Sequence, residues 1–102
     1  MSGRLAGEEL EHVDRSLSGG DVASAAQRLA VLLRLDPALA PVILSTADAA
    51  LRTTRPSRSQ LSALHLVRGD AYRILGRENE AAAAYRSAHQ ALATGTDREE
   101  PT

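Results

Sequence analysis

The sequence predicts an all-α fold of about five antiparallel helices, and three observations support this prediction. Alanine and leucine dominate the apolar residues, and alanine is the strongest helix former. Runs of β-branched and aromatic residues, which mark strands, are missing, and Tyr72 and Tyr85 are the only aromatic residues. Apolar residues also recur at spacings of three and four between glycine and proline breaks. With 102 residues, the chain has room for one domain with a modest core.

The first helix is expected at residues 8–18, after a flexible N-terminus at residues 1–7 that carries no strong pattern. Its apolar stripe consists of Leu10, Val13 and Leu17. Gly19 and Gly20 then stop the helix, because consecutive glycines readily supply a left-handed C-terminal cap. Asp21 follows as the N-terminal cap of the next helix.

The second helix is expected at residues 22–35, where a broad apolar stripe predicts burial on two sides. Asp36 and Pro37 form a good start for a third helix, since the acid can cap it and proline is tolerated in the first turn. This third helix should begin there, or at Pro41, and end near Thr53.

A fourth helix follows the break at Pro56, because proline disfavours helical geometry in the residue before it. Ser57 and Gln60 have the spacing of a capping box, which marks the start of this helix. The helix should run to Leu75 and end at Gly76.

The fifth helix is expected at residues 78–93, and the polar, charged tail at residues 94–102 is predicted to be disordered. Residues 8–93 therefore make up the expected helical domain.

The two last helices carry the strongest pattern of the chain, a helical hairpin with small residues where the helices would touch. Its key positions are Gly69, Tyr72, Ala81 and Tyr85. Residues 62–95 thereby resemble one tetratricopeptide repeat, a family of helical hairpins with the pattern W-x2-L-G-x2-Y, then A-x3-F, then P. His65 and Arg68 stand where the family has Trp and Leu, and the final Pro is missing.

Residues 6–39 resemble a second, degenerate copy, because apolar residues recur at the same offsets from Gly20 as from Gly76. The two copies are offset by 56 residues, whereas stacked repeats of this family are about 34 residues apart. The excess is one helix, which reverses the direction of the chain. Two arrangements stay open, a stack in which residues 53–60 cross over and a compact five-helix array, and the sequence favours the compact array.

The resemblance implies a protein-interaction module whose ligand lies along the first helix of each hairpin. In the second hairpin this face holds Leu66, Asp70, Arg73 and Ile74, and in the first it holds Leu10, Asp14 and Leu17. We therefore expect an adaptor that binds a peptide or protein segment, chiefly through the fourth helix. Apolar anchors with one or two charges would suit these residues.

Three alternatives stay open. The third helix could cover Leu66 and Ile74, leaving no exposed face. The chain could be a small-ligand-binding or regulatory domain in which the helices enclose a pocket. The chain could also form a homodimer, because residues 1–51 and 78–102 each carry a net charge of −3 while residues 52–77 carry +5.

The sequence gives little support for a catalytic or a metal-binding function. The chain has no cysteine, hence no disulfide, thiolate ligand or cysteine nucleophile, and without lysine it has no phosphate-binding loop of the Gly-x4-Gly-Lys type. Glu9 and His12 have a metal-site spacing, but the second such motif of a di-iron site is missing. We expect no enzyme, no cofactor and no metal.

Membrane and nucleic-acid partners are also disfavoured. No signal-peptide-like segment and no run of about 18 apolar residues occurs, so we expect a cytoplasmic protein. The basic segment at residues 52–77 is poor in aromatic residues for stacking on bases, which argues against nucleic acid as a partner.

Overall fold

A computed structural model describes residues 2–99, with side chains described from Gly7 to Ala93. This part of the chain contains five α-helices, one short 3-10 helix and no strand, which confirms the all-α prediction. The helices are α1 (Ser2–Ser18), α2 (Val22–Leu35), η1 (Pro37–Leu39), α3 (Ala40–Thr53), α4 (Arg58–Ile74) and α5 (Glu78–Glu99).

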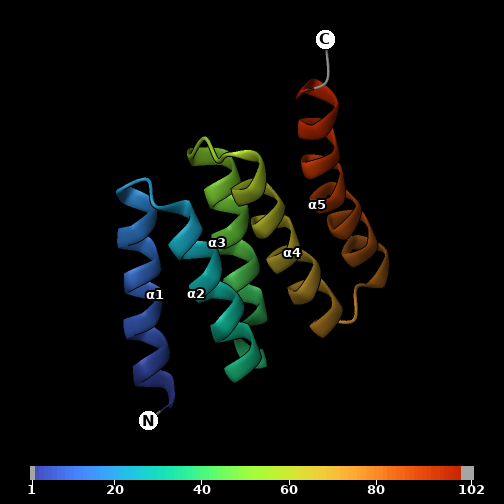
Figure 1. The fold of residues 1–102 in the computed structure, drawn as a ribbon. Helices are drawn as coiled ribbons and strands as arrows, with labels where there is room; N and C mark the ends of the chain where they lie inside the picture. Colours follow the sequence, from blue (N-terminus) through green and yellow to red (C-terminus); the bar gives the residue numbers. More distant parts are fainter. Residues whose placement is uncertain (1, 100–102) are drawn as a thin grey trace.

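The helices form a flattened array of 55 × 32 × 19 Å. Figure 1 shows α1, α3 and α5 running in one direction and α2 and α4 in the other, with α1 and α5 at the two edges. Helix α1 packs against α2, and α5 packs against α4. Helix α3 contacts both α2 and α4, which also contact each other.

Both hairpins turn through the same C-terminal cap. After α1, the Asp21 N–H donates to the Ser16 carbonyl at 2.7 Å and the Gly20 N–H to the Leu17 carbonyl at 3.0 Å. Two equivalent bonds of 2.8 and 3.0 Å close the turn at Gly76. The φ angles of the two glycines are +84° and +78°, the left-handed geometry that side chains other than glycine disfavour.

Caps and breaks fix the other predicted helix starts. The predicted capping box is present, since the Ser57 hydroxyl accepts from the Gln60 N–H at 3.2 Å and the Gln60 side chain accepts from the Ser57 N–H at 2.8 Å. Asp21 caps α2 by accepting from the Ser24 N–H at 3.2 Å. The two predicted starts of the third helix both have a counterpart, a 3-10 turn from Pro37 followed by the α-helix from Ala40.

The first and last helices extend beyond their predicted ends among the residues that the structure describes. Helix α1 begins at Ser2, although residues 1–7 were expected to be flexible, and α5 continues through residues 94–99 of the expected disordered tail. Met1 and residues 100–102 lie outside the described part. Once a helix exists, each added residue gains a backbone hydrogen bond, and a glycine in its path costs only about 1 kcal/mol.

The core lies between the first four helices. Its four largest fully buried side chains, one from each of these helices, are Val13, Leu29, Ile43 and Leu64. Helix α5 contributes small buried side chains instead, namely Ala81, Ala84, Ala88 and Ala91. The α4–α5 pair therefore depends on close approach of two backbones and not on large apolar side chains.

Candidate protein-binding grooves

An open groove runs between α2 and α4 and contains all four residues predicted on the fourth helix. It consists of two adjoining hollows of about 330 and 540 Å³, which share Ala30 and Asp70. We call it the α2–α4 groove; its main lining residues are Ala26, Ala30, Leu33 and Arg34 of α2, and Leu66, Asp70, Arg73 and Ile74 of α4.

The apolar side chains of this groove are open to solvent. Leu66 is 47% exposed and Ile74 is 46% exposed. Helix α3 leaves them uncovered because it meets α4 on another face, the one that carries Arg68. The alternative in which the third helix covers these residues is therefore wrong.

A hydrogen bond from α5 holds the polar centre of the groove. The Tyr85 hydroxyl donates to Asp70, and the ring of Tyr85 lies directly against Gly69. Burial, followed by the bond to Asp70, raises the pKa of Tyr85, so the hydroxyl keeps its proton at neutral pH. Asp70 is thereby fixed in place between the apolar side chains of Leu66 and Ile74.

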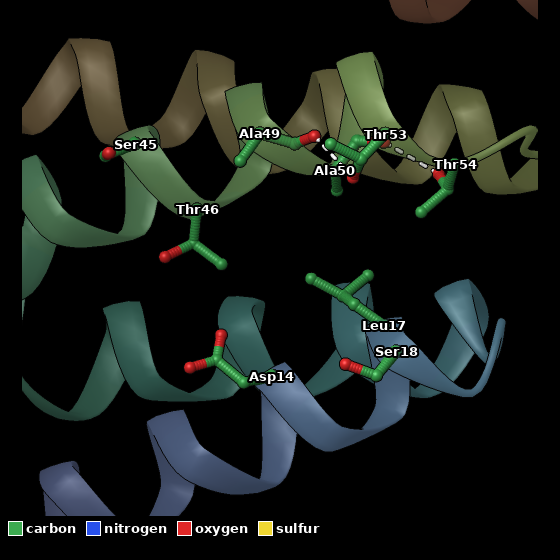
Figure 2. A pocket seen from close by; sticks show the side chains of 9 residues that line it. All are labelled: Asp14, Leu17, Ser18, Ser45, Thr46, Ala49, Ala50, Thr53 and Thr54. Carbon is green, nitrogen blue, oxygen red and sulfur yellow. Dashed lines mark hydrogen bonds between the residues drawn. The ribbon is translucent and has the colours of Figure 1, made fainter.

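A second open groove lies between α1 and α3. Its volume is about 560 Å³, and Figure 2 shows its walls facing each other. We call it the α1–α3 groove; it is lined by Asp14, Leu17 and Ser18 of α1 and by Ser45, Thr46, Ala49, Ala50, Thr53 and Thr54 of α3.

The residues predicted on the first helix do not join those on the fourth. Asp14 and Leu17 line the α1–α3 groove, whereas the α2–α4 groove contains neither. Leu10 lines neither groove and packs, partly buried, against the core. Helix α3 lies between the two sets of residues, because it lines the α1–α3 groove and also contacts α4.

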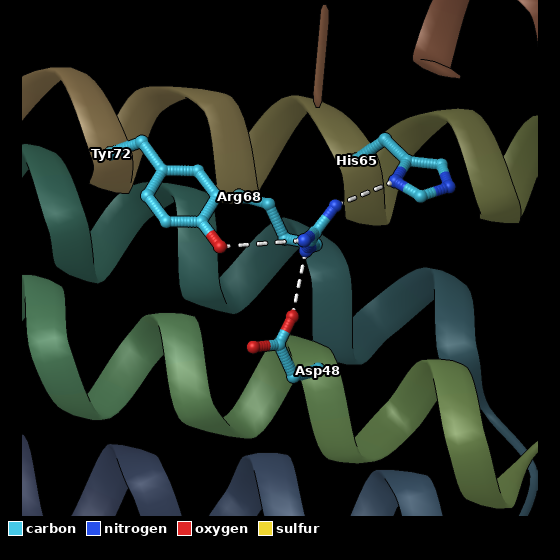
Figure 3. A network of polar contacts seen from close by, with 4 residues as sticks. All are labelled: Asp48, His65, Arg68 and Tyr72. Atoms are coloured by element: carbon cyan, nitrogen blue, oxygen red, sulfur yellow. Dashed lines mark hydrogen bonds and ion pairs between the residues drawn. The ribbon is translucent and has the colours of Figure 1, made fainter. Parts of the chain in front are cut away.

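A polar network that the sequence analysis missed joins α3 to α4 (Figure 3). The Arg68 guanidinium donates to Asp48 at 2.7 Å, approaches His65 Nδ1 at 3.2 Å and donates to the Tyr72 hydroxyl at 3.5 Å. It also lies 5.5 Å from the centre of the Tyr72 ring. One signal in the sequence could have indicated this network. Arg68 stands where the resembled family has Leu, and a partly buried charge at such a position is normally paired with an opposite charge.

The network makes stability depend on pH through His65. Burial first, and then the positive charge of Arg68, lower the pKa of His65 from 6.5, while Asp48 acts in the opposite direction. The unfolded chain therefore binds a proton at His65 before the folded chain does. The stabilisation that comes from neutral His65 is complete above pH 6.5. It is lost as the pH falls from 6.5 towards the lower pKa that His65 has in the folded protein.

We expect His65→Gln to weaken this pH dependence. The free energy of unfolding of the variant should fall less than that of the wild type as the pH drops below 6.5. Urea unfolding at a series of pH values measures the difference, and His89→Gln, at an exposed position of α5, is the matched control. Equal pH profiles for wild type and His65→Gln would contradict the expectation.

In the part of the chain with described side chains, no group of three His, Cys, Asp or Glu residues could hold a metal ion. Glu9, from the metal-like spacing, instead pairs with Arg28 of α2 at 2.9 Å. No helix among the described residues has both the length and the apolar character needed to cross a bilayer. No protein-family model, no curated protein and no solved structure matches this chain.

Proposed function

We propose that this protein is a non-enzymatic, tetratricopeptide-like interaction module that binds a peptide or protein segment in the α2–α4 groove. The observation that supports this proposal is the half-exposed pair Leu66 and Ile74, which line the two adjoining hollows of the α2–α4 groove. Contiguous exposed apolar surface with a polar rim is typical of interaction sites.

The spacing of these side chains suggests the form of the ligand. Leu66 and Ile74 lie two helical turns apart, about 12 Å at 1.5 Å per residue. A partner helix with apolar residues two turns apart matches this distance, and so does an extended segment with apolar residues four apart. Asp70 and Arg73 lie between the two anchors and can bind one donor and one acceptor of the partner.

The resemblance to the repeat family has its own support in the packing of α4 on α5. Gly69 and Tyr85, two positions of the repeat pattern, are in direct contact. The same glycine-terminated turn closes both hairpins. The inserted α3 remains the main departure from a regular repeat array.

The test is a binding measurement with a charged substitution in the groove. Peptides selected from a random library on the wild-type protein should bind Leu66→Glu at least about tenfold more weakly, because the carboxylate would replace an apolar anchor. Val42→Glu is the matched control, since Val42 is 43% exposed on α3 and lies outside the groove. Equal affinity for the wild type and Leu66→Glu would exclude the groove as the binding site.

The other two candidate functions have less support. All three hollows described above are open to solvent, whereas a small-ligand site would need an enclosed apolar cavity. Within the basic segment at residues 52–77, Arg68 is paired with Asp48 and Arg77 with Glu80. Less positive charge is therefore left to hold two copies of the chain together. A homodimer of this kind would dissociate as salt is raised, and a monomer at low salt would exclude it.

A further inference from the structure

The α1–α3 groove presents hydrogen-bond acceptors from its α3 wall. The hydroxyl of Thr46 donates to the Val42 carbonyl at 2.8 Å, and that of Thr53 donates to the Ala49 carbonyl at 2.8 Å. Thr54 donates in the same way to the carbonyl four residues before it, at 2.7 Å. Because a hydroxyl has a single hydrogen, these three threonines have only lone pairs left for a ligand.

The α1 wall adds a negative charge. Figure 2 shows Asp14 pointing across the groove towards Thr46. The Asp14 carboxylate is exposed and forms no hydrogen bond or ion pair with any side chain that the structure describes. An ionised carboxylate only accepts hydrogen bonds, so acceptors face the groove from both walls.

The remaining surface of the groove is mostly apolar. Leu17, Ala49 and Ala50 lie between the polar groups, and the methyl groups of the threonines add to them. Two serine hydroxyls at the edges, Ser18 and Ser45, can turn to donate or to accept. The ligand that fits such a surface has an apolar stem, a positive charge and several donors.

We propose that the α1–α3 groove binds the arginine side chain of a basic protein segment. A guanidinium carries five N–H donors in a planar fork and no acceptor, so it can bond to Asp14 and to the hydroxyl oxygen of Thr46 together. Its three methylene groups can lie against Leu17 and Ala49. This groove shares no lining residue with the α2–α4 groove, and the inference stands even if that groove binds nothing.

The experiment measures the affinity of a short, fluorescently labelled peptide of alanine and glutamine that carries two arginines. A second peptide replaces both arginines with citrulline, which keeps the shape and loses the charge. Wild-type protein should bind the arginine peptide and leave the citrulline peptide unbound at low salt. Asp14→Asn should weaken binding at least about tenfold, as expected for a hydrogen-bonded charge pair, and Thr46→Val should weaken it several-fold.

Glu11→Gln is the matched control, because it removes the same charge from an exposed site one turn away on α1. Its effect should stay below about twofold, as for a solvent-exposed charge. An equal loss for Glu11→Gln and Asp14→Asn would overturn the proposal, because binding would then follow the net charge of α1 alone. Equal binding of the citrulline peptide would overturn the choice of a cation.

Competition with spermidine separates a protein segment from a small cation. If the proposal is correct, spermidine at the same concentration leaves the arginine peptide bound, since it lacks the planar fork. Full displacement by spermidine would overturn the proposal and assign the groove to polyamines. Backbone amide shifts on adding the peptide should centre on Asp14, Thr46 and Thr53, and shifts confined to other helices would also overturn it.

Discussion

Replacing Gly69 with alanine is expected to lower the free energy of unfolding by about 2 kcal/mol. A methyl group at this position would lie 2.5 Å from Cε1 and 2.7 Å from Cδ1 of Tyr85, so the ring has to move. Overpacking of this kind costs about 1–3 kcal/mol. Moving the ring also breaks the solvent-exposed hydrogen bond from Tyr85 to Asp70, which costs about 1 kcal/mol, while alanine gains about 1 kcal/mol in helix propensity.

If the contact with Tyr85 causes the destabilisation by Gly69→Ala, removing the ring should reverse the sign of that change in the free energy of unfolding. In a Tyr85→Ala background the ring is absent, so Gly69→Ala should stabilise the protein by up to about 1 kcal/mol. Urea unfolding of the four proteins of this cycle gives the coupling between the two positions. A destabilisation of the same size in both backgrounds would show that the ring is not the cause.

Gly7 provides the matched glycine control. It lies in α1, and nothing lies within 4 Å of the place where its Cβ would be. Gly7→Ala should therefore stabilise α1 through helix propensity alone. The comparison with Gly69→Ala separates the cost of the tight α4–α5 contact from the general effect of removing a glycine.

The sequence was sufficient for features that depend on neighbours along the chain. The capping box at Ser57, the cap at Asp21 and the breaks at Gly20 and Gly76 are local signals, and all lie where they were predicted. Helices α1 and α5 extend beyond the predicted bounds, because helix propagation leaves no stop signal in the sequence.

The candidate sites were only partly predictable, for a different reason. The resemblance to the repeat family placed Leu66 and Ile74 on the expected ligand face of the fourth helix, and this needed no knowledge of α3. The groove between Asp14 and Thr46, like the ion pair of Asp48 with Arg68, depends on how α3 is placed beside α1 and α4. That placement is a long-range property, which helical periodicity does not contain.

The Asp48–Arg68 pair leads to the second large prediction. Asp48→Ala should lower the free energy of unfolding by about 2 kcal/mol, because it leaves the Arg68 guanidinium without its carboxylate. The Arg68 side chain is only 20% exposed, so water replaces the lost partner poorly. Asp48 itself is 34% exposed, and the cost therefore stays below the 3–5 kcal/mol or so of a fully buried pair.

Arg68→Leu should be much less harmful, because it removes the charge together with its need for a partner. We expect a loss below about 1 kcal/mol, and Asp48→Ala should cost little more in that background. Chemical denaturation of the two single variants and the double variant measures this coupling. Additive losses would mean that the two side chains do not support each other.

The pKa of His65 should shift in opposite directions in the Asp48→Ala and Arg68→Leu variants. Arg68 lowers the pKa of His65 and Asp48 raises it, although burial is the largest cause of its lowered value. Asp48→Ala should therefore lower the pKa of His65 further, whereas Arg68→Leu should move it back towards 6.5. An NMR titration of the His65 ring protons follows both shifts. Shifts of the same sign in the two variants would be inconsistent with this network, since a general loosening of α4 would expose the ring and raise the pKa in both cases.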